Sequence, residues 1–168
     1  MLILLSIKNT LKFMIVEENV DLLKVSNVEA IGHCANCFCT MGSGIANQIK
    51  KVFPEAYTAD LKTVSGDINK FGTFSVGVVN SNNTSIKYVY NLYGQYRYGR
   101  DSRKLNYEKI YTALESMEKS CKNNNVTFVG FPKNMGCMLA GGHWPIVYKM
   151  IEHIFSDPIY TVKICNYA

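Results

Sequence analysis

Short runs of β-branched and aromatic residues alternate along the chain with segments whose apolar residues recur every three or four positions. This alternation is typical of a sheet whose strands are joined by covering helices. Several of the strand-like runs are apolar at consecutive positions, as expected for strands buried on both faces. The pattern therefore predicts a layered α/β fold, with strands at residues 11–17, 28–34, 72–79, 86–93, 126–131 and 159–165.

Helical periodicity is clearest over residues 104–121, where the apolar positions share one face and charged residues take the other. A second helix is predicted over residues 145–155, because Pro145 suits the first helical position, where no backbone N–H is missed. Two shorter helices are predicted at residues 43–52 and 54–63.

Length and composition favour one globular domain spanning residues 1–168, with residues 1–13 as a candidate N-terminal extension. Its 48% hydrophobic residues predict a sizeable core. The apolar run at residues 1–5 is far shorter than the roughly 20 residues that span a bilayer, and no signal-peptide pattern surrounds it. We therefore expect a cytoplasmic protein with no membrane partner.

The net charge of +5 is modest and spread along the chain. It favours a small anionic ligand over duplex nucleic acid, which is an unsupported partner. Six cysteines are present, but a core of this size does not need disulfides, so we expect reduced thiols.

Two glycine-bearing segments, residues 36–46 and 132–142, each join a predicted strand to a predicted helix. Gly42 and Gly44 would let the backbone approach a ligand closely, and helix starts present unpaired N–H groups to anions. Neither segment has the Walker or the dinucleotide-fingerprint spacing. Because ligands bind at the carboxyl ends of strands in open α/β sheets, the two loops predict a cradle for a diphosphate.

Residues 21–23, 33–46 and 136–144 together resemble the macrodomain family, and the resemblance covers the chain from about residue 13. The most similar branch is the Appr-1''-p processing type, whose members bind ADP-ribose or hydrolyse ADP-ribose 1''-phosphate. The resemblance implies a three-layer α/β/α macrodomain with a mixed, mainly parallel six-stranded sheet, and the order of strands and helices agrees. We expect no cofactor and no metal.

The resemblance also implies residue roles. Asp21, followed by Leu22, would bind adenine, since a carboxylate accepts a hydrogen bond from an exocyclic amine; a turn or cap is its alternative role. Asn36 would contact the distal ribose, or else form an Asx turn. Tyr167 would stack on adenine, or belong to the core. The two loops would contribute the remaining ligand contacts through Gly42, Ser43, Gly44, Ile45, Met135, Gly136, Cys137, Met138 and Leu139.

His143 stands where related proteins usually carry Asp, so an imidazole replaces a carboxylate beside the expected phosphate site. It could act as a general acid or hold a phosphate as a cation, and it could equally be a helix-end residue. Asn36 and His143 are thus the candidate catalytic residues. The resemblance further implies that the branch removing ADP-ribose from glutamate with a lysine and an aspartate is excluded, because Gln95 and Ala140 stand where those two residues would be.

The function favoured by the sequence is hydrolysis of ADP-ribose 1''-phosphate. The alternative is a non-catalytic reader that binds free ADP-ribose or an ADP-ribosylated protein. Two further hypotheses rest on cysteine. A zinc site at His33, Cys34, Cys37 and Cys39 is disfavoured, because a single cluster cannot easily direct four groups at one centre. A Cys137 nucleophile ranks last, because Lys133 is the only cation in its loop.

Overall fold

The computed structural model describes residues 13–166, and its elements follow the predicted alternation. The strands are β1 (Met14–Glu18), β2 (Ala30–Asn36), β3 (Phe74–Val78), β4 (Tyr88–Gln95), β5 (Phe128–Pro132) and β6 (Thr161–Cys165). The α-helices are α1 (Gly44–Val52), α2 (Pro54–Leu61), α3 (Tyr107–Asn123) and α4 (Trp144–Ile154), and two short 3-10 helices are η1 (Leu22–Lys24) and η2 (Ile68–Lys70).

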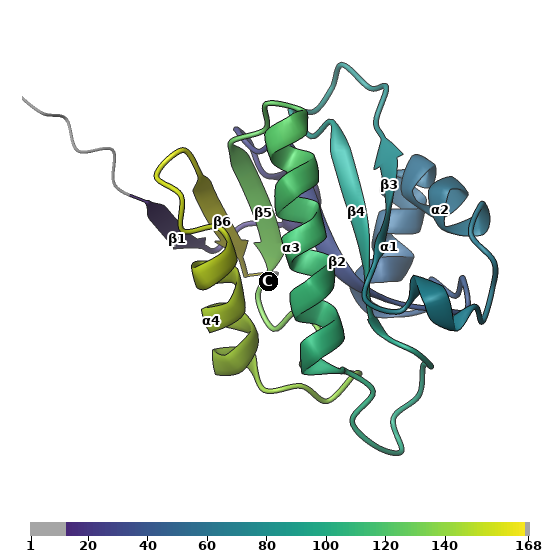
Figure 1. The fold of residues 1–168 in the computed structure, drawn as a ribbon. Helices are drawn as coiled ribbons and strands as arrows, with labels where there is room; N and C mark the ends of the chain where they lie inside the picture. Colours follow the sequence, from purple (N-terminus) through teal and green to yellow (C-terminus); the bar gives the residue numbers. More distant parts are fainter. Residues whose placement is uncertain (1–12, 167–168) are drawn as a thin grey trace, which may run out of the picture.

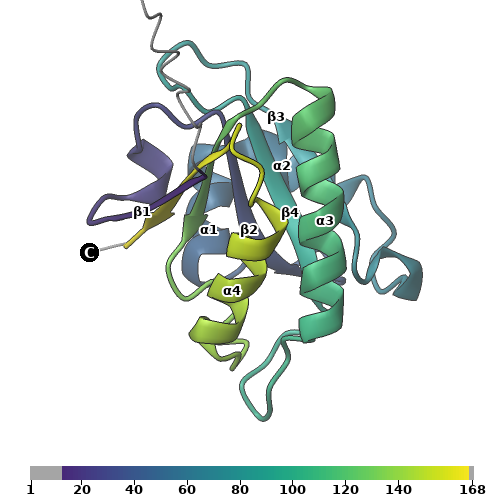
Figure 2. The ribbon, with the colours of Figure 1, turned by 60° about the vertical axis from the view of Figure 1, so that its left-hand side comes forward.

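The six strands form one sheet in the order β1-β6-β5-β2-β4-β3, in which every neighbouring pair is parallel except β3 with β4. Helices α3 and α4 cover one face, and α1 and α2 cover the other (Figures 1 and 2). This is a three-layer α/β/α fold with a mixed, mainly parallel six-stranded sheet, as predicted.

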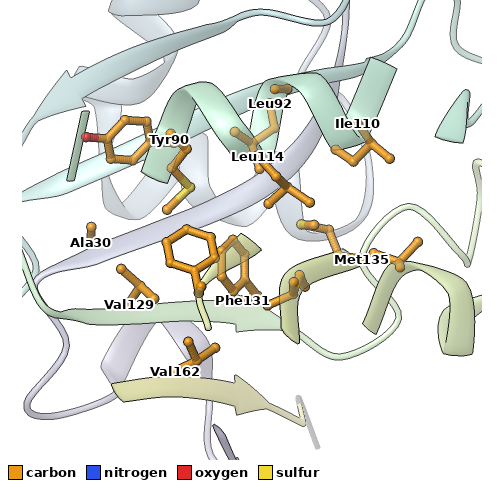
Figure 3. Packing of buried hydrophobic residues seen from close by; sticks show 14 of the residues in the cluster. Ala30, Tyr90, Leu92, Ile110, Leu114, Val129, Phe131, Met135 and Val162 are labelled. Atoms are coloured by element: carbon orange, nitrogen blue, oxygen red, sulfur yellow. The ribbon is translucent and has the colours of Figure 1, made fainter. Parts of the chain in front are cut away.

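The two faces of the sheet carry separate apolar cores. Phe131 and Val162 on the strands pack with Leu114 of α3 in the larger core (Figure 3). On the opposite face, Ile31 packs with Ile49 of α1 in the smaller one. Each core fixes the strand ends from which the connecting loops leave the sheet.

Helix boundaries differ slightly from the predicted ones for local reasons. Helix α3 begins at Tyr107 because the Asn106 side chain caps it, accepting a hydrogen bond from the N–H of Lys109 at 3.0 Å. Helix α4 begins at Trp144, so Pro145 takes the second helical position rather than the first. None of the helices in residues 13–166 is both long and apolar enough to cross a membrane.

Candidate functional site

The candidate site lies at the carboxyl ends of the neighbouring strands β2 and β5, where the chain leaves the two strands toward opposite faces of the sheet. From β2 the chain passes to α1 on one face, and from β5 it passes to α4 on the other. Such a divergence opens a crevice at the carboxyl ends of the strands, on the lower side in Figure 1. The crevice is bordered by residues 37–43, here named the first loop, and residues 133–143, the second loop.

Side-chain hydrogen bonds hold the first loop. The Asn36 amide Nδ2 donates to the carbonyl of Thr40 at 2.8 Å, and its Oδ1 accepts from the N–H of Phe38 at 2.9 Å. Asn36 thus forms the Asx-type turn that was one of its two predicted roles. It is 5% exposed at the end of β2, so its amide has one donor hydrogen left for a ligand.

A buried polar network anchors the first loop from below. The Cys39 thiol donates to the carbonyl of Asp60 at 3.2 Å, and Lys70 Nζ lies 3.4 Å from Cys39 Sγ. Lys70 also pairs with the Asp60 carboxylate at 3.5 Å, and both side chains are at least nine-tenths buried. A buried ion pair requires such additional partners, because its desolvation is costly.

The network continues across three strands as far as His33. The Tyr93 hydroxyl donates to Asp60 Oδ1 at 2.7 Å and lies 2.6 Å from Ser75 Oγ, which accepts from Asn91 Nδ2. Since the Asn91 amide nitrogen donates elsewhere, its Oδ1 accepts from His33 Nε2–H at 2.7 Å. Burial lowers the pKa of His33, so its imidazole is neutral, and its Nδ1 has no hydrogen-bond partner among residues 13–166.

The start of α1 completes the first side of the crevice. Its N-cap, Ser43, makes no side-chain cap hydrogen bond, and Gly42, Ser43 and Gly44 are exposed. The first N–H groups of a helix have no partner within the helix and carry its positive dipole end. This helix start can therefore hold an anion.

Main-chain turns hold the second loop. The N–H of Cys137 donates to the carbonyl of Asn134 at 2.8 Å, and the N–H of Gly142 donates to the carbonyl of Gly136 at 3.0 Å. Gly136 has a φ of 71°, which favours glycine. Within residues 13–166, the N–H groups of Met138 and Leu139 donate no hydrogen bond. The same holds for the N–H groups of Asn134, Gly136 and Ala140, so this loop offers several free donors, of which those of Met138 and Leu139 lie at its exposed tip.

The two loops meet at the crevice. An atom placed as a Cβ on Gly44 would lie 3.9 Å from Leu139 Cδ1, so the tip of the second loop reaches the start of α1. Met138 is 73% exposed and Leu139 40% exposed at that tip. Met135, by contrast, is buried in the larger core (Figure 3), so only its main chain can face a ligand.

Asp21 lies after β1, farther along the same edge. Its Oδ1 accepts from the N–H of Leu23 at 2.9 Å and caps η1, which is the alternative role predicted for it. Its Oδ2 lies 3.7 Å from Lys24 Nζ and keeps acceptor capacity for a ligand. Leu22 is fully buried, so its side chain is a core anchor. Tyr167 lies outside the described residues.

His143 occupies the N-cap of α4, where its N–H donates to the Tyr107 hydroxyl at 2.9 Å. It lines a shallow groove between α3 and α4 together with Tyr111, Met150 and His153. The helix-end role is therefore observed. A catalytic role stays a prediction, and it requires the imidazole to reach the crevice.

The cysteine hypotheses gain nothing from the geometry. Cys34 packs toward α3, and Cys39 contacts Asp60 and Lys70, while His33 bonds to Asn91. In the described part of the chain, no three such side chains gather as metal ligands. Burial raises the pKa of the Cys137 thiol to about 11, so it is a protonated thiol near neutral pH and a weak nucleophile.

The loop that follows β4, residues 96–106 and here named the basic loop, has no functional role among the sequence-based predictions. Four cations lie within eight of its residues, Arg97, Arg100, Arg103 and Lys104. The positive charge is therefore less evenly spread along the chain than predicted, and this local excess is visible in the sequence. The register of β2 with β4 pairs Asn36 with Gln95, so the basic loop begins beside the candidate site.

Comparisons with known proteins agree with this architecture. A model of the macro domain family matches residues 33–151. Human ADP-ribose glycohydrolase OARD1 is 31% identical over 148 residues, which cover 88% of this chain and 87% of that protein.

Two solved structures share the fold. The macrodomain of Mycobacterium tuberculosis DarG has a TM-score of 0.76 and 22% identity, covering 93% of this chain and 99% of that one. Thermosipho africanus DarTG in complex with ADP-ribose has a TM-score of 0.74 and 18% identity, covering 93% of this chain and 42% of that one. With the family match over well more than half of its length, the chain belongs to the macro domain family.

Proposed function

We propose that the chain binds ADP-ribose along the carboxyl edge of its sheet and hydrolyses ADP-ribose 1''-phosphate to ADP-ribose and phosphate. The observation that carries this proposal is the order of the strand ends. Asp21 follows β1, the second loop follows β5, and Asn36 ends β2. An acid, a loop with free N–H groups and an amide thus succeed one another along one edge, with strands about 4.8 Å apart.

Each group matches one part of the ligand. The free Asp21 oxygen would accept from the exocyclic amine of adenine. The N–H groups of Met138 and Leu139, with those at the start of α1, would hold the diphosphate. Asn36 would contact the distal ribose. The relative named as an ADP-ribose glycohydrolase and the similar fold in complex with ADP-ribose support this choice of ligand.

Hydrolysis would begin with attack of a water oxygen on the phosphorus of the 1''-phosphate. The bond from phosphorus to the ribosyl oxygen breaks and that oxygen takes up a proton, while the water oxygen stays on the released phosphate and its surplus proton passes to solvent. Free N–H groups of the second loop other than those assigned to the diphosphate, on the side where this loop meets the basic loop, would stabilise the charge on the phosphoryl oxygens. His143 is the candidate proton donor, and to act it would have to turn from the α3–α4 groove toward the second loop.

Two other activities are weaker candidates. Removal of ADP-ribose from glutamate is disfavoured, because Gln95 and Ala140 carry no titratable group at the two positions where the resemblance expects lysine and aspartate. A non-catalytic reader is the second candidate, and the position of His143 in the α3–α4 groove favours it.

Phosphate release from ADP-ribose 1''-phosphate tests the proposal. The native protein should release phosphate, and Asn36→Ala should lose most of that activity because the ribose contact and the first-loop turn are both removed. Asn82→Ala, in an exposed turn before β4, is the matched control and should remain active. Tight ADP-ribose binding without any phosphate release would leave only the reader.

The role of His143 has a separate test. If its imidazolium protonates the leaving oxygen, phosphate release should fall as pH rises, because the charged form disappears. His143→Ala should then lose about 10²-fold in rate. His153→Ala, in the same groove, should not. An active His143→Ala with an unchanged pH profile would assign the chemistry to the N–H groups and Asn36.

A further inference from the structure

A pocket of about 300 Å³ opens between the basic loop and the segment before β3. Its lining combines aromatic rings with cations and includes Phe71, Tyr96, Arg97, Ser102, Arg103 and Lys104. No sequence motif pointed to it, since Phe71 and the basic loop are distant in the chain. We name it the end pocket.

The two arginines of the end pocket are held in place but not neutralised. The Arg97 guanidinium lies 5.2 Å from the centre of the Phe38 ring and 5.7 Å from that of Tyr96. The Arg103 guanidinium lies 4.6 Å from the centre of the Tyr107 ring. Neither arginine has a carboxylate within 4.0 Å among the described residues. Stacking on a ring restrains the side chain while the N–H donors stay available.

Lys104 differs from the arginines, because its charge is already compensated. Its Nζ lies 2.8 Å from Asp101 Oδ1 and donates to Ser102 Oγ at 3.1 Å. The pair closes the turn of the basic loop. The uncompensated charge of the end pocket therefore resides on Arg97 and Arg103.

The basic loop is bonded to both loops of the candidate site. The carbonyl of Tyr96 accepts from the N–H of Cys37 at 3.0 Å, at the start of the first loop. The carbonyl of Ala140, in the second loop, accepts from the N–H groups of Lys104 and Leu105 at 2.8 and 3.0 Å. Because β4 follows β2 in the sheet, the end pocket is next in line after the proposed place of the distal ribose.

We propose that the end pocket is a phosphate-recognition subsite, in which Arg97 and Arg103 select ADP-ribose that carries a phosphate on its distal ribose over unmodified ADP-ribose. This inference rests on the proposed function, because it extends the ligand beyond Asn36. A phosphate monoester has several charged oxygens, and guanidinium groups match their spacing with paired N–H donors. Unmodified ADP-ribose ends in a neutral ribose, which cannot use the two cations.

The experiment compares binding and turnover in matched variants. Arg97→Gln and Arg103→Gln, singly and together, are compared with Arg100→Gln, an exposed arginine of the same loop that does not line the pocket. The KM for ADP-ribose 1''-phosphate, or its Kd if there is no turnover, should rise about tenfold or more in the double variant. The Kd for ADP-ribose should change less than twofold in every variant, which also shows that each variant is folded.

Further arms separate the possible failures. Arg103→Lys keeps the charge but not the paired donors, and should lose part of the preference for the 1''-phosphate. Equal behaviour of the double variant and Arg100→Gln, with normal ADP-ribose binding, would overturn the subsite and leave the proposed function standing. Failure of the native protein to bind ADP-ribose would instead overturn the proposed function and the subsite with it.

Discussion

The two loops that border the crevice are held by different chemistry. The first loop is fixed by side chains, namely the Asn36 amide above it and the network of Cys39, Asp60 and Lys70 below it. The second loop is fixed by its own main-chain turns, and its exposed tip ends in Met138 and Leu139. The first loop is thus tied to the sheet interior, whereas the second depends on glycine positions.

This difference predicts which substitutions each loop can tolerate. Removing one buried polar partner should disturb the first loop, because the groups left behind are desolvated without compensation. Adding a single methyl group should disturb the second loop, because its turns leave no room for a Cβ at certain glycines. The predictions below take these two vulnerabilities in order of expected size.

The largest effect should come from Asp60→Ala, which leaves the buried Lys70 ammonium without its carboxylate. The free energy of unfolding should fall by about 3–5 kcal/mol, the cost of breaking a buried pair. Chemical denaturation measures it. Glu152→Ala, which breaks the exposed pair with Lys149, is the control and should change stability little. Comparable losses in the two variants would contradict the assigned role of the network.

Gly142→Ala should have the next largest effect. A Cβ there would lie 2.4 Å from Leu105 Cδ2 and 2.7 Å from the carbonyl oxygen of Gly136, so the second loop must shift. We expect a stability loss of about 1–3 kcal/mol, as for overpacked sites. We also expect ADP-ribose affinity to fall about tenfold or more, because the free N–H groups move with the loop. An unchanged ADP-ribose affinity would show that the second loop does not contact the ligand.

Gly42→Ala provides the contrast on the first loop. The nearest side-chain atom to a Cβ there is Thr40 Cγ2 at 3.8 Å, an ordinary contact, so the free energy of unfolding should be nearly unchanged. If the ligand lies close to the main chain at Gly42, an added methyl group would displace it, and ADP-ribose affinity should fall by about tenfold. Calorimetric titration measures this affinity. An affinity equal to that of the native protein would show that the ligand does not lie against Gly42.

The smallest effect concerns pH and the end of the network at His33. Burial lowers its pKa, so the unfolded chain binds a proton more readily than the folded one. The contribution of His33 to the free energy of unfolding is therefore fully present above pH 6.5, the ordinary pKa of histidine in the unfolded chain, and it is lost as pH falls below that value. One pH unit below that value, the free energy of unfolding should have fallen by at most about 1.4 kcal/mol. His33→Gln should lack this component, whereas His153→Ala, at an exposed position, should retain it.

Much of the fold could be predicted from the sequence, because consecutive apolar runs mark buried strands and periodic ones mark helices. The places of the two loops were also predictable, since glycines follow two strands. The direction in which individual side chains of these loops point was not predictable. Met135 was placed in the ligand loop, and its side chain fills the core, so only its main chain is left for the predicted contact; the side chain of Leu22, the first residue of η1, is buried in the smaller core. A motif identifies a loop but does not say which of its atoms face outward.

The polar network was hidden for another reason. Asp60 and Lys70 come from a helix and a 3-10 turn whose polar residues resemble ordinary solvent-facing positions. Only the packing of α2 and η2 on the sheet buries them together. The end pocket was likewise unpredictable, because it needs Phe71 to lie against a loop that begins after β4.

The most direct test of the central claim is a calorimetric comparison of ADP-ribose with AMP, which shares the adenosine but lacks the second phosphate and the distal ribose. If the ligand extends from Asp21 across both loops to Asn36, ADP-ribose should bind at least about tenfold more tightly than AMP. Asp21→Ala should weaken both ligands. Equal affinities, or no ADP-ribose binding at about 1 mM, would contradict the account.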